Sequence, residues 1–307
     1  YDSRLSEIAE RIPNVDAERA LKEGRTDLRH LPFVTIDPET AKDFDDAVCL
    51  IEEKGKRTLW VAIADVAHYI EPETLLDDEA RARATSVYLP HAVLPMLPSR
   101  LSDNLCSLRA KVPRLAMTVS MEIENDWTIG KVTAFESIIE VQENLSYEEA
   151  LDNPKFQNMM DLAKELRRNE IRLNLNSAEL RPRVLEDEIS VNVKWPNKAT
   201  EMIETFMVAT NNSIGILLGE KNAPLPWRSH SPPDAPEVEE LNAKFKNMGI
   251  NIELPMPSVK KFGQSEEAEL VSMLGDWANT GNIEISGLEN SDGQDDVAQY
   301  LKNVLDP

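Results

Sequence analysis

The stretch DLRHLPFVTIDPETAKDFDDAVCL, residues 27–50, contains two short apolar runs separated by an acidic loop. The runs PFVTID (32–37) and AVCLIEE (47–53) are rich in β-branched and apolar residues, a composition typical of strands. Four aspartates fall within ten positions in and beside the loop: Asp37, Asp43, Asp45 and Asp46. Carboxylates this close repel one another, so their clustering needs a physical reason.

The strand pattern continues on the C-terminal side of this stretch. TLWVAIADVAHYI (58–70) reads as a longer strand after the turn EKGKR, and residues 115–124 and 131–145 show strand-like alternation. Between these strands, residues 77–87 have helical composition, and the prolines and polar breaks of residues 88–110 predict an ordered, irregular segment. The first half of the chain is therefore expected to form a mixed, mostly antiparallel sheet.

The second half of the chain is more helical. Apolar residues recur at spacings of three and four over residues 153–173, 198–220, 235–249 and 265–279, and residues 296–305 predict a last short helix. Sheet first and helices after define an α+β fold class. Residues 1–30, a short helix and a polar connection, are expected to be a lead-in to one domain that spans residues 31–307.

The overall composition restricts the class of protein. The hydrophobic fraction of 41% fits a globular chain, and no apolar run approaches the about 18 residues that a membrane span needs. The opening residues lack a signal-peptide pattern, so we expect a cytoplasmic protein. Cys49 and Cys106 are expected to be reduced core residues. The net charge of −22 disfavours nucleic acid, but a local arginine cluster can still hold phosphates on an acidic protein.

The four aspartates predict a metal site. A turn through PETAK is long enough to bring Asp43, Asp45 and Asp46 back beside Asp37. Oxygen ligands of this kind suit Mg²⁺ or Mn²⁺, and a pair of such ions is the usual arrangement for cleaving phosphodiesters. A solvated acidic turn and a calcium loop are the alternatives, although the stretch lacks the spacing and glycine of an EF-hand.

The surroundings of the aspartates resemble a known family. RTDLRHLPFVTIDPETAKDFDDAV (25–48), VAIADVAHYI (61–70) and the segment 86–119 are similar to the ribonuclease II and ribonuclease R (RNB) family of exoribonucleases. NLSYEEA, MIETFMVATN and PWRSHSPP match weaker family patterns in the same order, so the resemblance covers about residues 25–235.

The resemblance implies an RNB-type catalytic domain with helices packed around a central RNA channel. It implies processive 3′-to-5′ hydrolysis of single-stranded RNA to nucleoside 5′-monophosphates by a two-metal mechanism. By position, Asp37 and Asp46 match metal ligands, Asp45 matches the aspartate most needed for chemistry, and Asp43 matches a supporting catalytic and metal-binding residue.

The resemblance also implies three contacts to RNA. Tyr88, Tyr147 and Glu204 match family positions beside the 3′-terminal nucleotides, where an aromatic ring can stack on any base. Without the resemblance, Tyr88 reads as a core or rim residue and Glu204 as one more surface charge. His68 reads as a core residue within a strand. The basic run Arg81, Arg83, Arg100, Arg109 and Arg114 could line a phosphate path or form surface ion pairs.

The chain departs from the family pattern in two ways. No aromatic residue follows the arginine pair at 167 and 168, and the family's C-terminal section with its phosphate-binding arginine is not evident in residues 236–307. A diverged segment, a missing segment or a second polypeptide that completes the site would each account for the difference. A weakly active or non-catalytic RNA-binding scaffold is therefore the alternative function, and an acidic cation-binding protein unrelated to RNA is a third.

Overall fold

The computed structural model describes residues 3–89, 92–168, 179–185, 188–227, 234–249 and 253–256. Contacts divide the chain into two compact units: Tyr1–Asn169 with Asn176–Leu225, and Glu170–Leu175 with Pro226–Pro307. This division differs from the expected boundary at residue 30, and the assignment of residues 31–307 to one catalytic domain stays a prediction. The helices expected over 265–279 and 296–305 lie outside the described residues.

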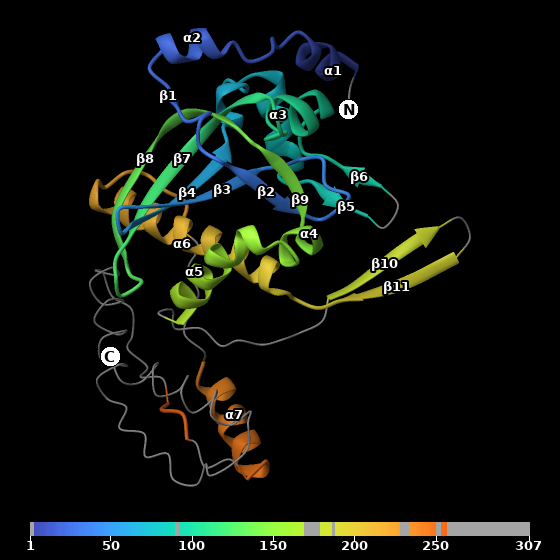
Figure 1. The fold of residues 1–307 in the computed structure, drawn as a ribbon. Coiled ribbons are helices and arrows are strands. Elements are labelled where there is room, and N and C mark those ends of the chain that lie inside the picture. The colour runs from blue at the N-terminus through green and yellow to red at the C-terminus, as the bar shows by residue number, and fades with distance from the viewer. Residues whose placement is uncertain are drawn as a thin grey trace. The chain divides into compact units, whose positions relative to one another are not determined.

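A seven-stranded sheet organises the first unit (Figure 1). Its spatial order is β1 (Thr26–Asp27), β8 (Ile129–Glu140), β7 (Pro113–Ile123), β4 (Lys56–Ala64), β3 (Asp46–Glu53), β2 (Val34–Asp37) and β9 (Glu143–Ser146). The pairs β1–β8 and β2–β9 are parallel, and the others are antiparallel. The expected α+β class with a mixed, mostly antiparallel sheet is confirmed.

Alternation along the strands builds two cores, one on each face of the sheet. On β2 and β3, Val34, Ile36 and Val48 belong to one cluster, whereas Ala47 and Cys49 belong to the other. This is the two-residue period of a strand covered on both faces. Both cysteines are buried and free, as expected.

Helices supply the other half of each core (Figure 1). One face of the sheet is covered by α4 (Tyr147–Leu151), α5 (Gln157–Arg168) and α6 (Lys198–Glu220). The other face is covered by α1 (Ser3–Glu10), α3 (Leu75–Arg83) and the π-helical turn Leu101–Leu105. A 3-10 turn, Pro154–Phe156, precedes α5. The helix expected over 198–220 has these observed bounds, and Asn197 begins it with a capping box.

The N-terminal residues are part of the folded unit. Leu5 and Leu28 are buried in the same cluster as the sheet, and β1 follows α2 (Ala17–Lys22) into the sheet. The apolar side chains of this segment therefore help to cover the sheet instead of forming only a polar lead-in.

Two local expectations differ from the structure. The strand expected over 58–70 ends at Ala64, because the Asp65 carboxylate caps the 3-10 turn Val66–His68 and accepts a hydrogen bond from the His68 amide at 3.3 Å. His68 is consequently exposed, so its reading as a core residue was wrong. The strands β10 (Glu179–Leu185) and β11 (Glu188–Lys194) pair antiparallel, which the sequence reasoning did not predict.

The remaining elements are short or belong to the second unit. β5 (Val87–Tyr88) and β6 (Val93–Leu94) form a small antiparallel pair, which begins at the last residue of the stretch expected to be helical and continues into the segment expected to be irregular. In the second unit, α7 (Ala235–Asn247) confirms the helix expected over 235–249, and the Asn242 side chain exchanges two hydrogen bonds with the Leu254 backbone. None of the helices described is long and apolar enough to cross a bilayer.

Candidate active site

The ends of β2 and β3 position the four aspartates. Asp37 is the last residue of β2 and Asp46 is the first residue of β3, so the loop between these neighbouring strands carries Asp43 and Asp45. Because the strands are antiparallel partners, the end of one lies beside the start of the other. The turn back expected from the PETAK step is thus present, starting with a hydrogen bond from the Ala41 amide to the Pro38 carbonyl at 2.8 Å.

The loop backbone is held by a buried serine. The Ser107 hydroxyl donates to the Lys42 carbonyl at 2.7 Å and accepts from the Phe44 amide at 3.1 Å. The Leu108 amide donates to the Phe44 carbonyl at 2.8 Å. These bonds fix the backbone around Phe44, whose side chain packs against the core. They therefore also fix the backbone positions of the two neighbouring aspartates, Asp43 and Asp45.

Burial and mutual repulsion perturb three of the carboxyl groups. Burial, followed by the charge of Asp46, raises the pKa of Asp37 to about 7. Burial, followed by the charge of Asp45, raises the pKa of Asp46 to about 6. The pKa of Asp45 is also raised, by burial and then by the charge of Asp43. The carboxylates therefore act on one another electrostatically, and the group is destabilised without a cation.

The donor set fits a divalent metal. Asp37 Oδ2 is buried and has no hydrogen-bond partner, which leaves a carboxylate oxygen to be satisfied by something else. Oxygen donors of this kind are the ligands that Mg²⁺ and Mn²⁺ prefer. Within the residues that the structure describes, however, no three histidine, cysteine, aspartate or glutamate side chains already converge closely enough to hold a metal ion. Metal binding at these four aspartates accordingly stays a prediction.

Tyr88 is joined to the aspartates by a direct contact. Its hydroxyl donates to Asp43 Oδ2 at 2.6 Å, across 45 positions in sequence, and this bond is the main reason that the Tyr88 pKa is raised to about 12. The residue is 65% exposed, at the end of β5. The reading of Tyr88 as a core residue is excluded, and an aromatic face lies open beside the acidic cluster.

Tyr147 and Glu204 occupy neighbouring elements. Strand register pairs Asp37 with Ser146, so Tyr147, the next residue, begins α4 close to the end of β2. Lys194 Nζ lies 5.1 Å from the centre of the Tyr147 ring. Glu204, on α6, has its carboxylate 3.8 Å from Arg167 on α5. The register therefore places Tyr147 near the cluster, while the role of Glu204 stays a prediction.

Sequence reasoning missed two polar residues that hold the site. Ser107 was not singled out, although a buried serine between Cys106 and Leu108 in an apolar stretch needs hydrogen-bond partners. Asn144 was also missed; its amide donates to Thr35 Oγ1 at 2.9 Å and to the Leu108 carbonyl at 3.0 Å. Together they tie the segment after the π-helical turn to β2 and to the aspartate loop.

The five arginines of the basic run divide into two groups. Arg81 and Arg83 form ion pairs one turn away on α3, with Asp77 at 2.9 Å and with Glu79 at 2.7 Å. For these two arginines, the prediction of surface ion pairs is therefore confirmed in place of a phosphate path. Arg100, Arg109 and Arg114 instead line a separate pocket.

The fold and the site define a class of protein: an α+β domain with an acidic cluster at adjoining ends of two strands in a mixed sheet. The family model described as "RNB domain" matches residues 25–279, further than the resemblance to residue 235 indicated. The chain belongs to the ribonuclease II/ribonuclease R (RNB) family.

Curated relatives support this assignment. Ribonuclease R of Mycoplasmopsis pulmonis is 33% identical over 263 residues, which cover 80% of this chain and 36% of that protein. Ribonuclease R of Chlamydia pneumoniae is 36% identical over 246 residues, covering 75% of this chain and 36% of that protein. The chain thus spans little more than a third of the length of these relatives.

Solved structures show the same fold. Mycoplasma genitalium RNase R in complex with ribose-methylated single-stranded RNA superposes with a TM-score of 0.76 at 27% identity, covering 90% of this chain and 45% of that one. Yeast Ssd1, a pseudonuclease, superposes with a TM-score of 0.63 at 17% identity, covering 95% of this chain and 35% of that one. The second likeness concerns the fold alone.

Proposed function

We propose that this chain carries the catalytic centre of a metal-dependent 3′-to-5′ exoribonuclease that degrades single-stranded RNA processively to nucleoside 5′-monophosphates. The observation that carries the proposal is the cluster of four aspartates, in which Asp37, Asp45 and Asp46 have raised pKa values and Asp37 Oδ2 is buried without a hydrogen-bond partner. A chain gains nothing in stability from such a set, since each carboxylate opposes the ionisation of the next. The similarity to ribonuclease R supports the choice of RNA as substrate.

The position of each aspartate suggests whether it would bind metal or take part in catalysis. Asp37 and Asp46, at the strand ends, are proposed as metal ligands together with Asp43. The Asp45 side chain is partly covered and partly open to solvent, and its carbonyl accepts a hydrogen bond from the Ala64 amide at 2.8 Å, so a fixed backbone presents its carboxylate to the substrate. Bound at these groups, Mg²⁺ or Mn²⁺ would supply water activation and leaving-group stabilisation in a two-metal hydrolysis.

The tyrosines would bind the RNA. The Tyr88 hydroxyl is fixed by Asp43 while its ring remains exposed, so a base can stack on it without a change of rotamer. Stacking contributes about 1–3 kcal/mol per base and tolerates any sequence, as a non-specific nuclease requires. Tyr147 and Glu204 are proposed to contact the terminal nucleotide from α4 and α6. A channel around the RNA, and a further segment or polypeptide that completes the site, stay predictions.

The experiment is degradation of a 5′-labelled single-stranded oligoribonucleotide with Mg²⁺, resolved on a denaturing gel. The wild-type chain should give a ladder that shortens from the 3′ end, and Asp45→Asn should reduce the rate by at least about a hundredfold. Asp126→Asn is the control, because Asp126 is an exposed aspartate in the turn between β7 and β8. Loss of cleavage in both variants, or in neither, would contradict the assignment of Asp45.

The second candidate is a non-catalytic RNA-binding protein. The observation that favours it is that, among the described residues, no carboxylates already converge into a metal-binding group. The same oligoribonucleotide distinguishes the two: binding by filter retention without any cleavage in Mg²⁺ or Mn²⁺ supports the scaffold, whereas metal-dependent shortening supports the nuclease.

A further inference from the structure

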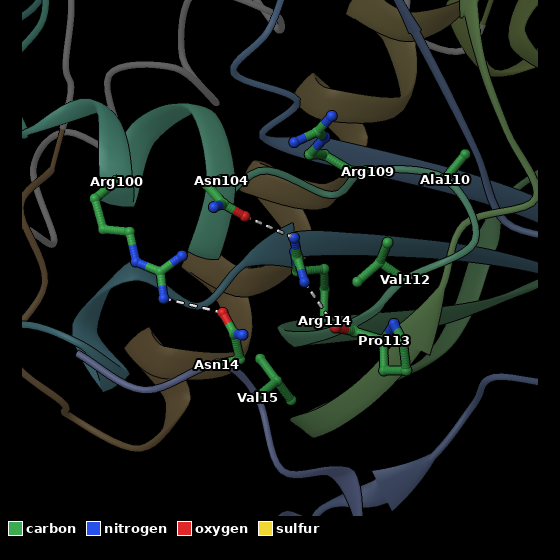
Figure 2. A pocket seen from close by; sticks show the side chains of 9 residues that line it. All are labelled: Asn14, Val15, Arg100, Asn104, Arg109, Ala110, Val112, Pro113 and Arg114. Carbon is green, nitrogen blue, oxygen red and sulfur yellow. Dashed lines mark hydrogen bonds between the residues drawn. The ribbon is translucent and has the colours of Figure 1, made fainter. Parts of the chain in front are cut away.

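A pocket of about 500 Å³ is lined by none of the four aspartates. It is formed by the chain after α1, by the π-helical turn and by the connection from that turn into β7. Its polar side chains are drawn in Figure 2: Asn14, Arg100, Asn104, Arg109 and Arg114. None of the residues lining it is acidic, which is unusual in a chain with a net charge of −22.

Arg114 brings a buried positive charge to the pocket. Its guanidinium donates to the Ser107 carbonyl at 2.9 Å, the Pro113 carbonyl at 3.2 Å and Asn104 Oδ1 at 3.2 Å. All three acceptors are neutral, and no carboxylate in the described part of the chain lies within ion-pair distance of Arg114. A buried cation without a counter-ion is costly. Three of the five N–H groups of this guanidinium are used, so two remain available to a ligand.

Arg100 lies on the opposite wall and is also incompletely satisfied. Its Nη2 donates to the Ile12 carbonyl at 3.0 Å and to Asn14 Oδ1 at 2.9 Å, as Figure 2 shows for the asparagine. Its Nε is buried and lacks a hydrogen-bond partner, and it forms a long ion pair with the Glu10 carboxylate at 4.0 Å. Two neutral acceptors and one distant carboxylate therefore hold the guanidinium, and its Nε–H keeps a free hydrogen-bond donor.

Arg109 adds a third positive charge to the pocket. It lines the same pocket, and its side chain is exposed. Burial lowers the pKa of Arg114, and the charges of Arg109 and Arg100 lower it further. These two cations therefore each repel the charge on Arg114. Such a group of like charges is stabilised by an anion that lies between them.

We propose that this pocket is a binding site for a phosphate group, held by Arg100, Arg109 and Arg114. The planar guanidinium matches two oxygens of a phosphate, and its charge-assisted hydrogen bonds are stronger than those between neutral groups. A phosphodiester of an RNA backbone and a free phosphate or phosphomonoester share this chemistry. The site is distinct from the aspartate cluster and does not depend on whether that cluster is catalytic.

The test is a titration of the whole ¹⁵N-labelled chain with sodium phosphate in EDTA, followed through the arginine Nε–Hε signals. Sodium chloride at matched ionic strength is the reference. The Arg100 signal, identified by its loss in Arg100→Lys, should shift saturably with phosphate and not with chloride. The dinucleoside monophosphate UpU, which has a phosphodiester and no terminal phosphate, forms the second arm. A shift with both ligands indicates a backbone site, and a shift with phosphate alone indicates a site for free or terminal phosphate.

Arg109→Gln is the binding variant because this exposed side chain does not support the core. Loss of one charge-assisted contact should weaken phosphate binding about tenfold. Lys131→Gln is the matched control, because it also removes one exposed cation. Pro113, which lines the pocket, pairs with Glu140 at the C-terminal end of β8, whereas Lys131 lies near the N-terminal end of that strand. The proposal is overturned if neither ligand shifts the Arg100 signal, or if Arg109→Gln binds phosphate as tightly as the control does.

Discussion

Asp37 shows how one residue links the sheet to the chemistry. Its backbone completes β2, its register partner is Ser146 on β9, and its Oδ2 is buried without a hydrogen bond. If Asp37 had only a structural role, this oxygen would be expected to accept a hydrogen bond from the protein or to lie in water. Burial instead raises the pKa of this carboxyl group to about 7, so the group loses its proton only near neutral pH.

This raised pKa predicts how stability depends on pH in the metal-free chain. Asp37 in the folded state loses its proton near pH 7, whereas an aspartate in the unfolded chain loses it near pH 3.8. The folded state is therefore most stable, relative to the unfolded chain, at low pH, and this contribution to the free energy of unfolding is lost as the pH rises from about 3.8 to about 7. In EDTA, the free energy of unfolding from urea denaturation should fall by roughly 2 kcal/mol between pH 4 and 7. Asp37→Asn should reduce that fall, because its amide does not ionise.

Asp126→Asn is the control for the pH measurement. The pKa of Asp126 is lowered, mainly by its hydrogen bond from Thr128, so its titration lies below the window of Asp37. This variant should keep the wild-type fall. An equal fall in Asp37→Asn would show that Asp37 is not the group that takes up the proton.

At the scale of elements, the decisive contact joins the aspartate loop to the segment after the π-helical turn. Local propensity leaves residues 38–45 irregular, yet Ser107 and the Leu108 amide hold the loop backbone at Lys42 and Phe44. Asn144 fastens the same segment to β2. The geometry of the acidic cluster is thus set by a residue more than sixty positions away.

Ser107→Ala should therefore weaken both the fold and the proposed metal site. Removing the buried hydroxyl leaves the Phe44 amide and the Lys42 carbonyl with one partner fewer, at a cost of about 1 kcal/mol in unfolding free energy. Affinity for Mn²⁺, measured by electron paramagnetic resonance, should fall several-fold because the loop is no longer held. Ser120→Ala, on β7, should change neither quantity. Wild-type Mn²⁺ affinity in Ser107→Ala would show that the loop holds its shape without this hydroxyl.

At the scale of the whole molecule, the acidic charge and the acidic cluster have different consequences. The net charge of −22 acts through general repulsion, which any salt screens. The four aspartates act locally, and only a cation bound among them removes their mutual repulsion and burial cost. The two effects can be separated by comparing divalent with monovalent salt.

Mg²⁺ should raise the melting temperature of the chain beyond the effect of ionic strength. A ligand at one hundred times its Kd stabilises the folded state by about 2.7 kcal/mol, which corresponds to roughly 5–10 °C for a unit of this size. Differential scanning calorimetry with MgCl₂ and with NaCl at equal ionic strength measures the difference. Asp45→Asn should lose most of the Mg²⁺ increment and keep the NaCl effect. An identical increment in both salts would argue against a specific site.

Sequence alone determined most of the long strands and helices, the α+β class and the four aspartates, because alternation, helical spacing and a run of carboxylates are local properties. It also identified Tyr88 and Tyr147 through family resemblance. Only the tertiary structure decided that the Tyr88 hydroxyl donates a hydrogen bond to Asp43 and that β9 brings Tyr147 beside Asp37. It also showed that Ser107 holds the backbone of the aspartate loop. It also showed that Asp65 ends β4 early and that three arginines share a pocket. These features join residues that are distant in sequence, and the free energy of such contacts depends on burial and pairing that local periodicity does not encode.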